Sequence, residues 1–148
     1  MKYIFVRHGK THFNEIQLKQ GWCDSPLTKQ GIKEIEQLKD YKIDAAYTSP
    51  ILRAKNTAQI ILKNHSVLLN EDGRLKEVNF GLLEGLPCLF VDKLQLESSN
   101  WLDDLQMDYT GYEGENVEDV IQRHFELLND IEKKFQDDDT ILMVGHGC

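Results

Sequence analysis

A short apolar run near the start of the chain ends abruptly in polar, reactive residues, and this junction constrains the fold more than any other feature. Tyr3 to Val6 is apolar and rich in strand-forming side chains, and Arg7, His8 and Gly9 follow it directly. In open α/β sheets, ligands bind just beyond the carboxyl ends of the strands, where a glycine lets the backbone approach an anion. The sequence therefore predicts a buried strand that delivers a cation and an imidazole to a ligand site.

Strand-like runs and helical stripes alternate along the rest of the chain, which is the pattern of α/β folds. Thr28 can cap a helix over the stripe that follows it, and residues 117–135 have the spacing of a long amphipathic helix. The 148 residues, 41% hydrophobic and 28% charged, suit one compact domain. We predict a single domain over residues 1–148 with a three-layer α/β/α sandwich and a mostly parallel central sheet.

Two more apolar runs, residues 45–48 and 140–144, end near further polar candidates. Serine is a favoured N-cap and proline a favoured first helical residue, so the Ser49-Pro50 pair predicts a helix start with Arg53 in or near its opening turn. Exposed amides and the positive end of the helix dipole lie there, which favours an anion. The second run leads to His146, so three strand ends contribute to one predicted site.

Four ordered segments of the chain match the motifs of one known family. They are R-H-G-x-T-x-x-N at 7–14, G-W-x-D-x-P-L-T-x-x-G at 21–31, L-x-E-x-x-F-G-x-x-E-G at 75–85 and G-H-G at 145–147. On these residues the chain resembles the histidine phosphatase (phosphoglycerate mutase-like) superfamily. The resemblance implies transfer of a phosphoryl group through a histidine, with neither a metal ion nor another cofactor.

The resemblance also implies a role for each candidate residue. His8 matches the family nucleophile and Glu77 its general acid. The remaining catalytic and phosphate-binding candidates, by the same matching, are Arg7, Asn14, Gln20, Gly21, Arg53 and His146. From the residues alone, Asn14 and Gln20 could equally cap turns, and Glu84 is expected to fix its loop rather than to assist Glu77.

Among the reactions of such a family, a phosphatase acting on small phosphate monoesters is the favoured prediction. Gln20 resembles the phosphatase branch more than the mutases, which usually carry Ser or Thr there, and the chain has no long basic insertion of the mutase kind. The alternatives are a phosphoglycerate mutase-type phosphotransferase, an α-ribazole phosphatase, which residues 75–86 also resemble, and a catalytically silent module that binds a phosphorylated ligand.

Charge and cysteine content limit the partners. A net charge of −8 argues against nonspecific binding to nucleic acid or to an anionic membrane, because both require a basic face. The expected partner is a small phosphorylated metabolite, and the oligomeric state is left open. The three cysteines form no C-x-x-C pair, and the chain has neither a signal peptide nor a membrane-spanning apolar run, so we expect a cytoplasmic protein.

Two regions depart from the regular pattern. Residues 86–112 scatter Trp101, Tyr109 and Tyr112 among acidic residues, and we expect a lid or a substrate-selecting insertion there. The sequence stops at Cys148, whereas family members normally continue past the G-H-G motif with a helix and a strand. The expectation is therefore a domain that is short at this end and leaves an apolar part of the sheet uncovered.

Overall fold

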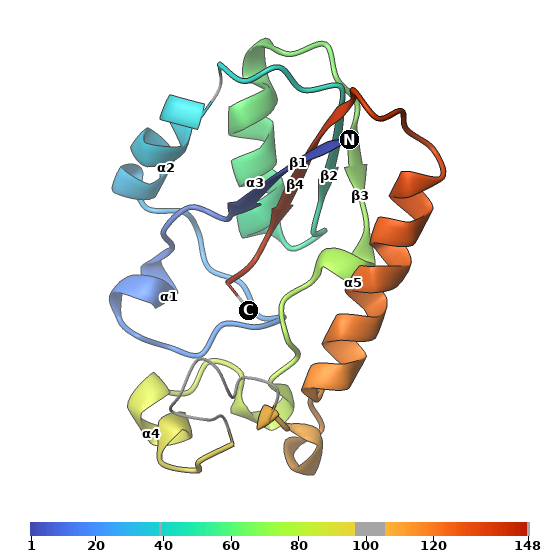
Figure 1. The fold of residues 1–148 in the computed structure, drawn as a ribbon. Helices are drawn as coiled ribbons and strands as arrows, with labels where there is room; N and C mark the ends of the chain where they lie inside the picture. Colours follow the sequence, from blue (N-terminus) through green and yellow to red (C-terminus); the bar gives the residue numbers. More distant parts are fainter. Residues whose placement is uncertain (39, 97–105, 148) are drawn as a thin grey trace.

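Four parallel strands form the centre of the computed structural model, which describes residues 1–38, 40–96 and 106–147 (Figure 1). In spatial order the strands are β1 (Lys2–Arg7), β4 (Thr140–Gly145), β2 (Ala45–Thr48) and β3 (Leu69–Glu71). Arg7 pairs with Gly145 and Thr48 with Val144, so the first three strands end nearly level with one another. This parallel sheet confirms the predicted fold class.

Helices cover both faces of the sheet (Figure 1). One face packs against α2 (Lys29–Ile35) and α3 (Leu52–Ile61), and the other packs against α5 (Val117–Glu132). Small residues let α3 approach closely, since Ala54 and Ala58 are fully buried against the sheet. The three-layer arrangement is the one predicted. The shorter helical elements are α1 (His12–Glu15), η1 (Glu36–Leu38), η2 (Leu62–Asn64), η3 (Gly73–Leu75), η4 (Gly81–Leu83), α4 (Cys88–Asp92) and η6 (Thr110–Tyr112).

The position of each strand explains its composition. β4 is flanked on both sides and covered on both faces, so residues 140–144 are all buried and almost all apolar. β1 lies at an edge, where Phe5 is 67% exposed. An apolar groove of about 400 Å³ runs beside β1 and is also lined by Leu38 and Tyr41. Exposed apolar surface therefore lies along this edge.

One predicted helix start is correct and another is wrong. Thr28 caps α2, because its hydroxyl accepts a hydrogen bond from the Gly31 amide at 3.0 Å. The prediction that Ser49 and Pro50 begin α3 fails, since the N-cap is Ile51 and has no side-chain capping bond. The Ser49 amide instead donates to the Val144 carbonyl at 3.0 Å, which prolongs the strand ladder. The Ser49 hydroxyl accepts from the Ile51 amide at 3.3 Å and also reaches the site described below.

A third apolar cluster lies beyond the carboxyl ends of the strands, around α4 and η6 (Figure 1). Tyr109 is completely buried there and meets Phe80 edge-on, with ring centroids 4.8 Å apart. Part of the predicted lid, including Trp101, falls outside the described residues. Within the described part, α4 and Tyr109 pack onto the domain, and α4 begins at Cys88 beside the candidate site.

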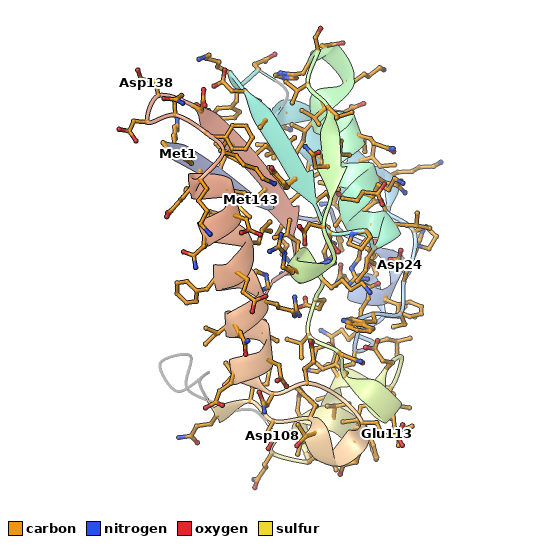
Figure 2. The ribbon with its side chains drawn as sticks, turned by 90° about the vertical axis from the view of Figure 1, so that its right-hand side faces the viewer. Met1, Asp24, Asp108, Glu113, Asp138 and Met143 are labelled. Atoms are coloured by element: carbon orange, nitrogen blue, oxygen red, sulfur yellow. The ribbon has the colours of Figure 1, made fainter. Side chains whose placement is uncertain are left out.

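The two ends of the sheet differ in chemistry. Figure 2 shows Met1 and Asp138 at one end and Asp24 toward the other, nearer Asp108 and Glu113. The acidic run at 137–139 makes a turn before β4, in which the Gln136 amide donates to an Asp139 carboxylate oxygen at 2.8 Å.

Within residues 1–38, 40–96 and 106–147, no helix has the length and apolar character needed to cross a membrane.

Candidate active site

A pocket of about 170 Å³ lies where β1 and β4 end. It is lined by five of the predicted site residues, whereas Gly21, Arg53 and His146 are not on its wall. Its lining residues are Arg7, His8, Asn14, Leu18, Lys19, Gln20, Glu77, Phe80, Cys88 and Gly147. In the part of the chain that the structure describes, no three His, Cys, Asp or Glu side chains converge as a metal site would require.

His8 is held in one defined tautomer. It follows β1 directly, its amide donates to the Gly145 carbonyl at 3.0 Å, and its side chain is only 6% exposed. Its Nδ1 lies 2.8 Å from the Gly9 carbonyl oxygen. Because a carbonyl can only accept, Nδ1 carries the proton and Nε2 keeps its lone pair. The neutral ring therefore presents a nucleophilic nitrogen to the pocket.

His146 lies beside His8 and has a partner from β2. The two ring centroids are 5.2 Å apart, and His146 Nε2 is 2.9 Å from the Ser49 hydroxyl. Burial lowers the pKa of His8 to about 4, and the positive charges of Arg53 and Arg7 add to the shift. Burial also lowers the pKa of His146 to about 2, again with a contribution from Arg53. Both rings are therefore neutral at physiological pH.

This electrostatic arrangement predicts the titration of the site. A folded-state pKa of about 4, below the ordinary 6.5, keeps His8 neutral down to acidic pH. As pH falls, His8 takes up a proton in the unfolded chain before it does so in the folded chain. Its protonation therefore lowers the stability of the fold as pH falls from about 6.5 to about 4. In NMR spectra, the ring signals of His8 and His146 should keep their neutral positions from roughly pH 8 to 5. A His8 midpoint near its ordinary value would contradict the burial that the structure gives it.

Arg53 is clamped by the backbone of a neighbouring loop. It is 1% exposed, near the start of α3. Its Nη2 donates to the carbonyls of Gln20 and Gly21 at 3.1 and 2.7 Å. Its Nη1 donates to the Cys23 carbonyl at 2.8 Å and to Asp24 Oδ1 at 3.2 Å. These bonds use both terminal nitrogens and fix the plane of the guanidinium.

Three buried side-chain nitrogens near His8 have no hydrogen-bond partner among the described residues. They are Gln20 Nε2, Arg53 Nε and His146 Nδ1. Gln20 Oε1 lies 3.1 Å from the Thr11 hydroxyl, which leaves the amide nitrogen as the free end of that side chain. Buried donors without partners are costly, and native proteins seldom keep them without a ligand or water. Gln20 Nε2 and Arg53 Nε can only donate, and together with the nearby cationic Arg7 they indicate a site for an anion.

Asn14 both caps a turn and lines the pocket. Its Oδ1 accepts from the Thr11 amide at 3.0 Å, and its own amide donates to the Thr11 hydroxyl at 3.2 Å. Together these bonds form a capping box that begins α1. The two interpretations left open by the sequence are therefore compatible for this residue.

Glu77 also lines the pocket. It is 7% exposed, and Oε1 accepts from the Val78 amide at 3.0 Å. Oε2 accepts from the Gly147 amide at 3.3 Å, which ties Glu77 to the segment after β4. Gly147 packs against the Arg7 guanidinium, since a Cβ there would lie 2.8 Å from Arg7 Cζ. The carboxyl group and the nucleophilic histidine thus line one small cavity.

Arg123, on α5, supports the Glu77 segment and was missed by the sequence analysis. Its guanidinium donates to the carbonyls of Arg74, Lys76 and Glu77 at 2.7, 2.6 and 3.0 Å. It also pairs with Glu115 at 3.1 Å. A lone arginine within an amphipathic stripe gives no such signal, because its partners are backbone carbonyls far away in sequence.

Replacing Arg123 by alanine should destabilise the fold and misplace Glu77. The change removes one donor from each of three carbonyls and from the half-buried Glu115 carboxylate, so we expect a loss of about 2–4 kcal/mol in the free energy of unfolding. The Glu77 carbonyl keeps its bond from Trp22 Nε1, and Glu115 keeps its bond from the Asn79 amide. Urea denaturation measures this loss. Lys133→Ala is the matched control, because that side chain is 76% exposed and pairs only at the surface with Asp130. Equal stabilities for the two variants would contradict the clamp.

Comparisons with known proteins agree with this geometry. The model of the histidine phosphatase superfamily (branch 1) matches residues 3–148. A 2,3-bisphosphoglycerate-dependent phosphoglycerate mutase of Cytophaga hutchinsonii is 33% identical over 97% of this chain and 71% of its own length. Matches to other curated phosphoglycerate mutases are shorter and span 35% to 47% of those proteins.

Solved structures of two kinds share the fold. A phosphoglycerate mutase from Bacillus anthracis superposes with a TM-score of 0.82 and 29% identity, over 98% of this chain and 74% of the other. A putative α-ribazole-5'-P phosphatase from Escherichia coli gives a TM-score of 0.79 and 27% identity, over 99% of this chain and 74% of the other. Similarity of fold thus extends equally to proteins named mutase and phosphatase.

Proposed function

Because the chain belongs to the histidine phosphatase superfamily, we propose that it hydrolyses small phosphate monoesters through a phosphohistidine on His8, without a metal ion. The observation that carries this proposal is the set of buried nitrogens without partners beside a neutral imidazole. A phosphoryl group would accept hydrogen bonds from Gln20 and Arg53, next to a nucleophile in the right tautomer. Arg7 would add positive charge at the pocket mouth.

The proposed reaction has two steps. His8 Nε2 attacks phosphorus, the bond from phosphorus to the ester oxygen breaks, and Glu77 gives its proton to the departing oxygen. A water molecule then attacks the phosphohistidine, Glu77 takes a proton from it, and the bond from nitrogen to phosphorus breaks. Phosphate and the neutral imidazole are the products, so Glu77 recovers its proton. The flanking donors stabilise the charge on the phosphoryl oxygens in both transition states.

The pocket suits a phosphoryl group. Its volume is about 170 Å³, and Leu18, Phe80 and Cys88 supply the apolar part of the wall. Lys19 brings a further cation, with Nζ 4.9 Å from the Phe80 ring centroid. A compact phosphorylated metabolite is therefore the proposed partner. The three cysteines form no C-x-x-C pair, which suits a reducing compartment, and we propose that the enzyme is cytoplasmic.

A mutase is the second candidate, because the Cytophaga relative and the Bacillus structure carry that name. The two reactions differ in the fate of the phosphoryl group. A phosphatase gives it to water, whereas a mutase returns it to another hydroxyl of the substrate. We favour the phosphatase because Gln20 resembles that branch and because the chain has no long basic insertion of the mutase kind.

The test is release of inorganic phosphate from a panel of small phosphate monoesters in excess chelator. Stoichiometric release supports the phosphatase and ranks its substrates. Conversion of phosphoglycerates to their isomers without net release supports the mutase instead. Folded protein that does neither, and in which no ester phosphorylates His8, would be a silent binding module.

A further inference from the structure

The carboxylate of Glu84 binds four backbone amides at once. Oε2 accepts from Gly21 and Cys23 at 3.1 and 3.0 Å, and Oε1 accepts from Trp22 and Phe80 at 2.8 and 3.0 Å. Three of these amides belong to consecutive residues of one loop. Glu84 is not on the pocket wall, so these bonds account for its position without any contact to a ligand.

The same loop holds Arg53 from its other side. In a trans peptide unit, the N–H of one residue points away from the C=O of the residue before it. The Gly21 and Trp22 amides face Glu84, so the carbonyls of Gln20 and Gly21 face the opposite way. Those are the two carbonyls that accept from Arg53 Nη2, at 3.1 and 2.7 Å. Each of these peptide units therefore links the carboxylate to the guanidinium directly.

Gly21 makes this close approach possible. A Cβ at this position would lie 2.3 Å from the Val78 carbonyl oxygen and 2.4 Å from Glu84 Oε1. No side chain fits there without moving the loop. The glycine that the sequence analysis assigned to phosphate binding thus lies behind Arg53, where it lets the loop reach Glu84.

This arrangement fixes the direction in which the Arg53 Nε–H group points. Both terminal nitrogens are committed to the loop and to Asp24, so the orientation of the loop sets the plane of the guanidinium. Nε is the buried donor that has no partner among the described residues. Cooperative polarisation along linked hydrogen bonds strengthens this path, because each peptide unit is bound at both ends.

We infer that Glu84 is a positioning residue, which orients Arg53 for the phosphoryl group through the peptide units of residues 20–22. This inference rests on the proposed function for its catalytic consequence, but the orientation itself is a property of the unliganded protein. Glutamine at position 84 keeps the shape of the side chain but replaces one acceptor oxygen by an NH2 donor. That donor would face either the Gly21 and Cys23 amides or the Trp22 and Phe80 amides, which are themselves donors. The guanidinium should then lose its fixed plane.

The experiment combines NMR with kinetics on Glu84→Gln. In the free protein, we expect the Arg53 Nε–H signal to shift and to exchange faster with solvent. With an active substrate, we expect kcat to fall by roughly 10- to 100-fold, as for a misplacement of about 1 Å. In an Arg53→Lys background, Glu84→Gln should lower kcat by less than about 2-fold, because Glu84 is proposed to act through Arg53. Glu84→Asp, one methylene shorter, should give a smaller change of the same kind and serves if the glutamine variant does not fold.

The matched control is Asp44→Asn, which removes another carboxylate bound to a backbone amide, Thr140 at 2.8 Å. It should leave kcat and the Arg53 signal unchanged. An unchanged Arg53 signal in the Glu84 variants, or an equal loss of kcat with and without Arg53, overturns the inference. A changed signal in a protein that releases no phosphate retains the positioning role and rejects the proposed function.

Discussion

His8→Ala protein should release phosphate from small monoesters at least about 10⁴-fold more slowly than the wild type. The proposed mechanism needs an imidazole nitrogen that attacks phosphorus, and His8 is the one histidine among the described residues that line the pocket. The neighbouring His146 ring is not on the pocket wall, and its Nε2 is engaged with the Ser49 hydroxyl. Loss of the nucleophile therefore stops both steps, whatever the leaving group.

The fold should survive this substitution. Among the described residues, the His8 side chain makes one hydrogen bond, to the carbonyl of the adjacent Gly9. Its alanine variant keeps the amide bond to Gly145 and hence the strand ladder. Phosphate release and a thermal melt on the same samples separate loss of chemistry from loss of structure. His12→Ala is the control, since His12 lies in the same motif but is exposed and pairs with Glu15 at the surface. A folded His8→Ala protein that keeps more than about 1% of the activity would exclude His8 as the nucleophile.

Most of the fold was predictable because its signals are local. The apolar runs of β1 and β4 and the amphipathic stripe of α5 each follow from side-chain period over one element. A parallel sheet then requires that the ends of these strands meet at one edge. The positions of His8 and His146 follow from that requirement, and their 5.2 Å separation agrees with it.

Arg123 escaped prediction because it acts through backbone groups. It binds carbonyls that every residue carries, so residue types contain no trace of these partners. Glu84 was expected to fix a loop, but its four amide partners were not predictable for the same reason. The start of α3 was misplaced for a related reason. A serine followed by proline is a good capping pair locally, but the Ser49 amide completes the sheet and its hydroxyl reaches His146, a tertiary choice that outweighs the local preference.

The Glu77→Gln substitution should separate esters by the basicity of their leaving group. An alkoxide is a poor leaving group, so its departure needs a proton, and removing the general acid should slow alkyl phosphates by about 10²- to 10⁴-fold. Nitrophenolate leaves without a proton, so the first step with p-nitrophenyl phosphate should slow much less. The glutamine retains the acceptor oxygen that Val78 or Gly147 needs, which limits damage to the pocket.

The same variant should also reveal the second step. If Glu77 activates the water, its loss slows hydrolysis of the phosphohistidine, so phosphoenzyme should accumulate with p-nitrophenyl phosphate and appear as a burst of nitrophenolate followed by slow turnover. Rapid mixing measures the burst, and an acid-labile phosphoryl label on the protein identifies the phosphoenzyme. Glu71→Gln, at an exposed carboxylate that pairs with Lys55, is the control and should behave as wild type. An unchanged rate on alkyl phosphates would remove Glu77 from the role of acid. A slowed first step without a burst would leave it as acid only, because the water would then need a different base.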